Sequence, residues 1–222
     1  MIERVLVVAP HPDDETLGCG GTLLRLAQSG AQLAWLIVTG ISREGGFSDE
    51  RVRERDLEIE KVSNLFGFKE VFNLKLPTRQ LDRVPFHDLM GQFSTVYRSF
   101  KPDQVFLPNR SDVHTDHRIV FDAGAACSKW FRFPSVQRVL AYETLSETDF
   151  ALGESSLFRP NYYVDISAHL ERKLEVLQLY KSEIDEFPFP RSLEAVRALA
   201  KLRGSTAGFK AAEAFHLLRE RI

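Results

Sequence analysis

The chain has 222 residues, enough to bury one sizeable hydrophobic core. Hydrophobic residues make up 44% and charged residues 27%, and the 29 Lys and Arg nearly balance the 31 Asp and Glu, which excludes a disordered chain and disfavours nucleic acid as a partner. Two cysteines are too few for a disulfide framework or a thiolate metal cage. The apolar runs are only long enough for strands, so we expect no membrane span. We expect a single cytoplasmic domain over residues 1–222.

The first predicted element is the run "VLVVA" at residues 5–9, which is continuous and β-branched, as is typical of a parallel strand covered on both faces. Leucines at helical spacing over 16–29 and the apolar run 33–38 complete a strand–helix–strand unit. The later predicted elements are a helix at 49–66, a strand at 70–74, a helix at 85–100, a strand at 103–108, a helix at 117–131, strands at 138–142 and 162–166, and helices at 168–184, 193–203 and 209–221. This alternation predicts an α/β fold, a Rossmann-like three-layer sandwich with a mostly parallel sheet.

Two polar segments directly follow predicted strands. "PHPDDE" at 10–15 comes after the first strand, and "NRSDVHTDH" at 109–117 comes after the strand that ends at Pro108. Ligands of open α/β sheets bind outside the carboxyl ends of the strands. We therefore expect these two segments to form one site.

The residue types in these segments favour a metal ion. His11 and Asp14, three positions apart, can converge in a tight turn, and His117 can reach the same point from the second segment. Two imidazoles and one carboxylate form a Zn²⁺ site of the catalytic type, with a fourth position for water whose pKa falls toward ~7. Another divalent transition metal is left open. A cation also relieves the repulsion between adjacent carboxylates.

The remaining polar residues have candidate roles around that ion. Asp13, beside a ligand but free to point elsewhere, is the candidate general base. His114, as an imidazolium, could stabilise an oxyanion or protonate a leaving amine. Asp116 or Asp112 could accept a hydrogen bond from one of the histidines and so orient it.

Two other interpretations of the first segment are weaker. Acidic residues at 13–15 could simply cap the following helix, but capping leaves the histidines unexplained. The glycines of "GCGG" at 18–21 invite comparison with a dinucleotide-binding loop, yet the G-x-G-x-x-G spacing would need glycine at Leu23. We expect these glycines to allow close packing of the helix on the strands.

The stretch "PHPDDETLGCGGTL" together with "HTDH" resembles the PIG-L/LmbE family of zinc-dependent N-acetylglucosaminyl deacetylases, and the similarity continues through "RDLEIEKVSNLFGF", "FRPNYYVDIS", "KLEVLQLYKSEI" and "RGSTAGFKAAEAF". The family fold is likewise Rossmann-like. The resemblance implies metal ligands at His11, Asp14 and His117. It also implies a general base at Asp13, transition-state stabilisation by His114 with Asp116 as its neighbour, and a substrate contact at Arg55.

The chain departs from the family pattern at two places near the expected substrate pocket. Many relatives have a Pro-Asp-Gly-like turn where this chain has "LPTRQLD", and some have a tyrosine where Asp112 stands. The identity of the sugar conjugate therefore stays open.

From these observations we expect a zinc-dependent hydrolase that removes the acetyl group from a small-molecule amino-sugar conjugate, releasing acetate and a free amine. One alternative is a zinc amidase for another N-acyl substrate, such as a thiol conjugate. A second is a non-catalytic, metal-dependent sugar-binding module, which would have no use for Asp13. Relatives often self-associate, so a homo-oligomer is also left open.

Overall fold

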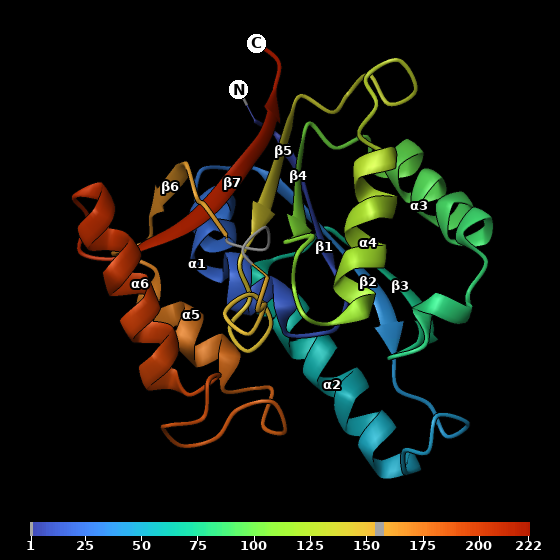
Figure 1. Ribbon diagram of the computed structural model, residues 1–222, viewed down its shortest axis with the longest axis horizontal. Helices are drawn as coiled ribbons and strands as arrows, with labels where there is room; N and C mark the ends of the chain where they lie inside the picture. Colours follow the sequence, from blue (N-terminus) through green and yellow to red (C-terminus); the bar gives the residue numbers. More distant parts are fainter. Residues whose placement is uncertain (1, 154–157) are drawn as a thin grey trace.

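The computed structural model describes residues 2–153 and 158–222 and shows one seven-stranded sheet with helices on both faces (Figure 1). The strand order is β3-β2-β1-β4-β5-β7-β6. The first five of these strands are parallel, and β7 runs antiparallel to both of its neighbours. The strands are β1 (Arg4–Ala9), β2 (Gln32–Gly40), β3 (Glu70–Pro77), β4 (Gln104–Pro108), β5 (Arg138–Tyr142), β6 (Tyr162–Asp165) and β7 (Ala212–Glu220).

Strand β1 lies in the middle of the parallel part of the sheet, between β2 and β4. Each residue from Val5 to Ala9 is fully buried, as the uninterrupted apolar run predicts. The chain builds β2 and β3 on one side of β1, then crosses to build β4 and β5 on the other. The carboxyl ends of β1 and β4 therefore flank the point where the strand order reverses, which is where open α/β sheets bind ligands.

The helices form the two outer layers and confirm the three-layer prediction. Val5 and Val7 of β1 belong to the apolar cluster shared with α1, α2, α5 and α6, whereas Leu6 and Val8 belong to the cluster shared with α3 and α4. This split follows from the alternation of side chains across a strand. The helices are α1 (Asp14–Gln28), α2 (Asp49–Phe66), α3 (Phe86–Phe100), α4 (Thr115–Ala126), α5 (Leu170–Leu177) and α6 (Leu193–Ala207), with a short 3-10 helix η1 (Leu81–Arg83).

The sequence-based prediction is wrong at the C-terminal end. The helix expected at 209–221 is strand β7, which pairs with β5 and β6. Its sequence "AEAFHLLRE" is rich in good helix formers, but filling the position between two strands overrides that weak preference. The helix expected at 168–184 also ends early, because α5 stops at Leu177.

The glycines of α1 serve close packing, as the sequence indicates. A Cβ atom on Gly18 would lie 2.2 Å from Cδ2 of Tyr142, and one on Gly21 would lie 2.7 Å from Cγ2 of Ile166. Glycine thus lets α1 approach the strands closely enough to bring its N-terminus to the edge of the sheet. Among the described residues, none of the helices has the length and apolar character needed to cross a membrane.

Candidate active site

The two polar segments meet at the carboxyl ends of β1 and β4. His11 lies in the loop between β1 and α1, and His114 is the N-cap residue of α4. The first loop is fixed from the neighbouring strand, because the backbone N–H and the hydroxyl of Thr39 both donate to the carbonyl of Pro10, at 3.0 and 2.8 Å. The structure therefore brings together segments about a hundred residues apart, as the sequence predicts.

Three of the expected ligands converge on one point. His11, Asp14 and His117 each offer an atom, and these atoms lie within 4.8 Å of one another. Nδ1 of His11 is 3.2 Å from Oδ2 of Asp14, and Nε2 of His117 is 3.4 Å from the same oxygen. The imidazole centroids of His11 and His117 are 5.4 Å apart. This spacing suits a single ion with ligand bonds of about 2.0–2.2 Å.

Two buried carboxylates orient the two histidines. Nδ1 of His117 is 2.8 Å from Oδ2 of Asp112, and Nε2 of His11 is 3.2 Å from Oδ2 of Asp116. A proton on each of these ring nitrogens leaves the other nitrogen of each ring unprotonated and facing Asp14. Such carboxylate–histidine pairs fix the tautomer and orientation of metal-binding imidazoles.

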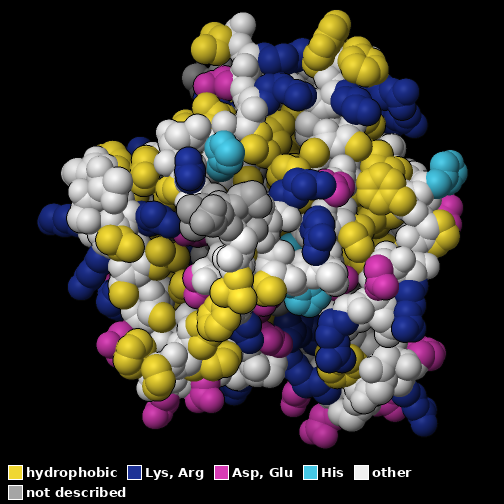
Figure 2. Space-filling view, in the orientation of Figure 1, with side chains coloured by type: hydrophobic (Ala, Val, Ile, Leu, Met, Phe, Trp, Pro, Cys, Tyr) yellow, Lys and Arg dark blue, Asp and Glu magenta, His cyan; other side chains and the backbone are white. Residues whose placement is uncertain are grey.

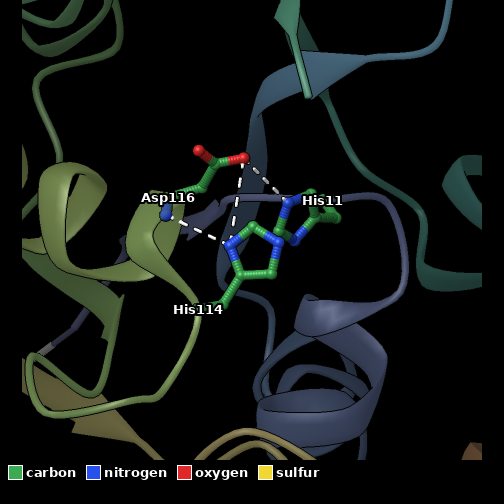
Figure 3. A group of neighbouring side chains, drawn as sticks. All are labelled: His11, His114 and Asp116. Atoms are coloured by element: carbon green, nitrogen blue, oxygen red, sulfur yellow. Dashed lines mark hydrogen bonds and ion pairs between the residues drawn. The ribbon is translucent and has the colours of Figure 1, made fainter. Parts of the chain in front are cut away.

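A second group, formed by His11, His114 and Asp116, could also hold an ion by the spacing of its atoms (Figure 3). Asp116, however, already accepts hydrogen bonds from the backbone N–H groups of Arg79 and Leu81, at 2.7 and 3.3 Å, in addition to His11. Within residues 2–153 and 158–222, the carboxylate of Asp14 accepts one backbone hydrogen bond, from His11 N–H at 2.9 Å. The donor set therefore fits a cation better at Asp14 than at Asp116.

The electrostatics around Asp14 also favour positive charge there. Although burial opposes the charged form, His117 and His11 hold the pKa of Asp14 well below its usual range. Burial likewise opposes protonation of His11, yet its hydrogen bonds to Asp116 and Asp14 raise its pKa to about 9. The negative charge of this buried carboxylate can be neutralised either by protons on the histidines or by a bound cation.

Asp13 lies beside the cluster and lines a cavity of about 390 Å³. It is 7% exposed, and within the described part of the chain its carboxylate accepts no hydrogen bond. Burial, and then the negative charge of Asp14, raise the pKa of Asp13 well above its usual value. A carboxylate without a fixed partner, in a cavity, beside a candidate metal site, suits a base that exchanges protons with substrate and water.

His114 also lines the cavity, and the structure indicates its protonation state. Nδ1 of His114 accepts the backbone N–H of Asp116 at 3.1 Å, so the ring proton is on Nε2. Burial, and then the nearby His11, lower the pKa of His114 to about 4. A neutral imidazole in this position can donate a hydrogen bond from Nε2 into the cavity.

The structure places Arg55 in the wall of the same cavity, where it is 7% exposed. Its Nη1 donates to the carbonyl of Pro12 at 2.7 Å, its Nε is 3.0 Å from Oε2 of Glu58, and its Nη2 pairs with Glu183. These partners show that Arg55 shapes the loop that carries Asp13 as well as facing the cavity.

Sequence reasoning did not identify much of the outer cavity wall, which comes from α2, from the loops after β2 and β5, and from the irregular segment after α5. Arg51 lies four residues before Arg55 on the same helix face, and both face the cavity. The segment after α5 carries no motif or periodicity that marks it. The wall residues that this segment supplies, which the sequence did not indicate, are Ser182, Glu183 and Arg191. Figure 2 shows exposed histidine atoms (cyan) next to a group of Lys and Arg side chains (dark blue), below the centre of the view.

Several known proteins are similar to this chain in sequence, in fold or in both. The diacetylchitobiose deacetylase of Thermococcus kodakarensis is 29% identical over 220 residues, covering 96% of this chain and 82% of the relative. A probable N-acetyl-alpha-D-glucosaminyl L-malate deacetylase 2 of Bacillus anthracis is 25% identical over 81% of each chain. The structure of the N,N'-diacetylchitobiose deacetylase from Pyrococcus horikoshii with its inhibitor MPG has the same fold, with a TM-score of 0.79, 22% identity, and coverage of 98% of this chain and 84% of that one.

A family model described as GlcNAc-PI de-N-acetylase matches residues 6–128, which is more than half of the chain. The matched region contains both polar segments and every site residue expected from the sequence. The chain therefore belongs to the PIG-L family of GlcNAc-PI de-N-acetylases.

Proposed function

We propose that this protein is a metal-dependent hydrolase that removes the acetyl group from an N-acetylated amino sugar or its conjugate, releasing acetate and a free amine. The convergence of two imidazole nitrogens and a carboxylate oxygen beside Asp13, in a cavity, is the observation that carries this proposal. The family and the relatives support it, because they are named as deacetylases of N-acetylated amino sugars.

His11, Asp14 and His117 would hold the ion. Two nitrogens and one oxygen are the protein ligands of many catalytic zinc sites, so we take Zn²⁺ as the metal. When bound, the ion polarises the amide carbonyl and makes a water molecule more acidic. Asp112 and Asp116 keep the ring nitrogens of the two histidines directed at it.

Asp13 would act as the general base by taking a proton from the attacking water. His114 would donate a hydrogen bond from Nε2 to the carbonyl oxygen, which gains negative charge as water adds to the carbonyl carbon. When the carbon–nitrogen bond breaks, the departing nitrogen needs a proton. Asp13, protonated by the attacking water, can supply it, and the products are acetate and the free amine.

The cavity suits a sugar that carries several hydroxyl groups. Its walls present polar and charged side chains from three segments, including Arg55, Glu147 and Arg191. A guanidinium can hydrogen-bond two neighbouring hydroxyls or a charged substituent. We expect Arg55, whose side chain is less exposed than that of Arg191, to contact the amino sugar itself.

The test is metal analysis combined with measurement of acetate release from a panel of N-acetylated amino sugars and nucleotide sugars. We expect about one divalent ion per chain and turnover of at least one panel member. Asp13→Ala should abolish turnover while the metal stays bound, because Asp13 is not a ligand. Turnover of Asp13→Ala at the wild-type rate would remove Asp13 from the role of base.

Two other outcomes would redirect the proposal. Cleavage of acylated amino acids or thiol conjugates without cleavage of sugars would indicate a different amidase. Sugar binding that needs the metal, without turnover of any panel member, would indicate a binding module.

A further inference from the structure

The peptide bond between Pro12 and Asp13 is held from both sides by side chains. Arg55 Nη1 donates to the carbonyl oxygen of Pro12 at 2.7 Å, and the N–H of Asp13 donates to Oε2 of Glu15 at 3.0 Å. These two backbone groups belong to one planar trans peptide unit and point in opposite directions. A guanidinium and a carboxylate therefore fix the orientation of this peptide plane.

The residue that follows this plane has an unusual backbone. Asp13 has φ 135° and ψ −29°, a region that side chains other than glycine rarely adopt. A strained conformation of this kind persists only where the surroundings impose it. The two hydrogen bonds hold the peptide plane before Asp13, and its own carbonyl accepts the N–H groups of Thr16 and Leu17, so the backbone of Asp13 is fixed on both sides.

Glu15 is itself held in place and lies away from the cavity. It is fully buried, and Oε1 accepts hydrogen bonds from the hydroxyls of Tyr180, at 2.9 Å, and Thr16. It is not among the residues that line the cavity. Glu15 can therefore affect the reaction only through the groups that it holds.

We propose that Glu15 is a positioning residue that fixes the backbone of Asp13 and thereby aims its carboxylate at the attacking water. This inference rests on the proposed function, in which Asp13 is the general base. It also gives the three adjacent acids distinct tasks: Asp13 takes the proton, Asp14 binds the metal, and Glu15 holds Asp13 in position. Tyr180 links the two side chains that hold this peptide plane. Its hydroxyl donates to Glu15, and Cζ of Arg55 lies 5.7 Å from the centroid of its ring.

The test compares Glu15→Met with Glu15→Gln. Methionine has a similar size but cannot accept the N–H of Asp13, whereas glutamine keeps one acceptor oxygen. For Glu15→Met we expect kcat to fall by about 10–100-fold, as for other residues that orient a reacting group, with KM and metal content unchanged. Glu15→Gln should recover most of the lost kcat. Crystal structures should show the Asp13 backbone leaving φ 135° in Glu15→Met and keeping it in Glu15→Gln.

Glu213 provides a matched control within the same part of the molecule. It is a buried carboxylate that accepts the backbone N–H groups of Gly21 and Thr22 farther along α1, at 2.9 and 2.7 Å. Glu213→Met should lower the melting temperature and leave kcat near the wild-type value. Equal losses of kcat in the two Met variants, or a wild-type kcat in Glu15→Met, would overturn the proposal.

Two further measurements keep the test decisive. If Glu15→Met does not fold, Tyr180→Phe serves in its place, because it removes one hydroxyl donor to Glu15. We expect a smaller fall in kcat at unchanged KM. A wild-type kcat would contradict the inference. Asp13→Ala separates this inference from the proposed function. An active Asp13→Ala refutes the role of Asp13 as base, whereas an inactive Asp13→Ala beside a fully active Glu15→Met refutes only the role of Glu15.

Discussion

The floor and the rim of the cavity are built on different principles. The floor consists of groups whose orientation is set by buried carboxylates and backbone atoms, namely His11, Asp13, Asp14, His114 and His117. The rim consists of partly exposed groups that pair with one another, namely Arg51, Ser182, Glu183 and Arg191. We infer that the floor carries the chemistry and that the rim adjusts which sugar conjugate binds.

The floor should fail completely when a ligand is removed. His117→Ala deletes a nitrogen that lies 3.4 Å from Asp14 Oδ2, so we expect less than one ion per chain and turnover at background. Metal analysis and acetate release measure the two effects. His87→Ala, at a histidine side chain that is 98% exposed, is the control and should change neither. Normal turnover in His117→Ala would remove it from the ligand set.

The orienting carboxylates should produce the next largest effect. Asp112→Asn weakens the acceptor for His117 Nδ1, and we expect metal affinity to fall by about 10–100-fold. Competition with a chelator measures the affinity. Asp122→Asn alters a carboxylate whose ion pair with Arg110 is exposed, and it should leave the affinity unchanged. If the wild type, Asp112→Asn and Asp122→Asn bind the metal with equal affinity, His117 does not need the Asp112 carboxylate to orient it.

The packing beneath the floor should show as a loss of stability. Gly18→Ala would place Cβ against the ring of Tyr142, and overpacking of this kind destabilises by about 1–3 kcal/mol. In Gly91→Ala the new Cβ meets nothing within 4 Å, so replacing this glycine inside α3 should stabilise by up to about 1 kcal/mol. Urea unfolding measures both changes. A neutral Gly18→Ala would mean that α1 can move away from the sheet.

The rim should give the smallest effect. Arg191 donates to Glu183 O and Ser146 Oγ, each at 2.7 Å, and its side chain is 21% exposed. For Arg191→Gln we expect KM for the sugar conjugate to rise several-fold at unchanged kcat, because a contact made equally in ground and transition states affects binding alone. Steady-state kinetics separates the two parameters. A fall in kcat at constant KM would place Arg191 in the chemistry and erase the distinction between rim and floor.

The contrast between floor and rim also explains how much the sequence could predict. Parallel strands end at one edge of the sheet, so two polar segments that follow buried apolar runs had to meet there, and His11 and His117 do lie together. Three of the four rim residues come from a segment after α5 without periodicity, and they reach the cavity only through the tertiary fold. The identity of β7 depended on its neighbours in the sheet, since helix propensity pointed the other way.

The sequence also could not reveal the protonation of the floor. The tautomer of His114 depends on a backbone N–H that Asp116 donates to Nδ1, and the backbone of Asp13 is held by Glu15 and Arg55. Both are local consequences of loop geometry, and residue type and spacing alone do not determine them.

Diffraction data from a metal-loaded crystal, collected at the absorption edge of zinc, would locate the ion itself. We expect one anomalous peak bonded to Nδ1 of His11, Oδ2 of Asp14 and Nε2 of His117 at about 2.0–2.2 Å, with the carboxylate of Asp13 beside it but not bonded to it. A peak elsewhere, or direct coordination by Asp13, would contradict this expectation.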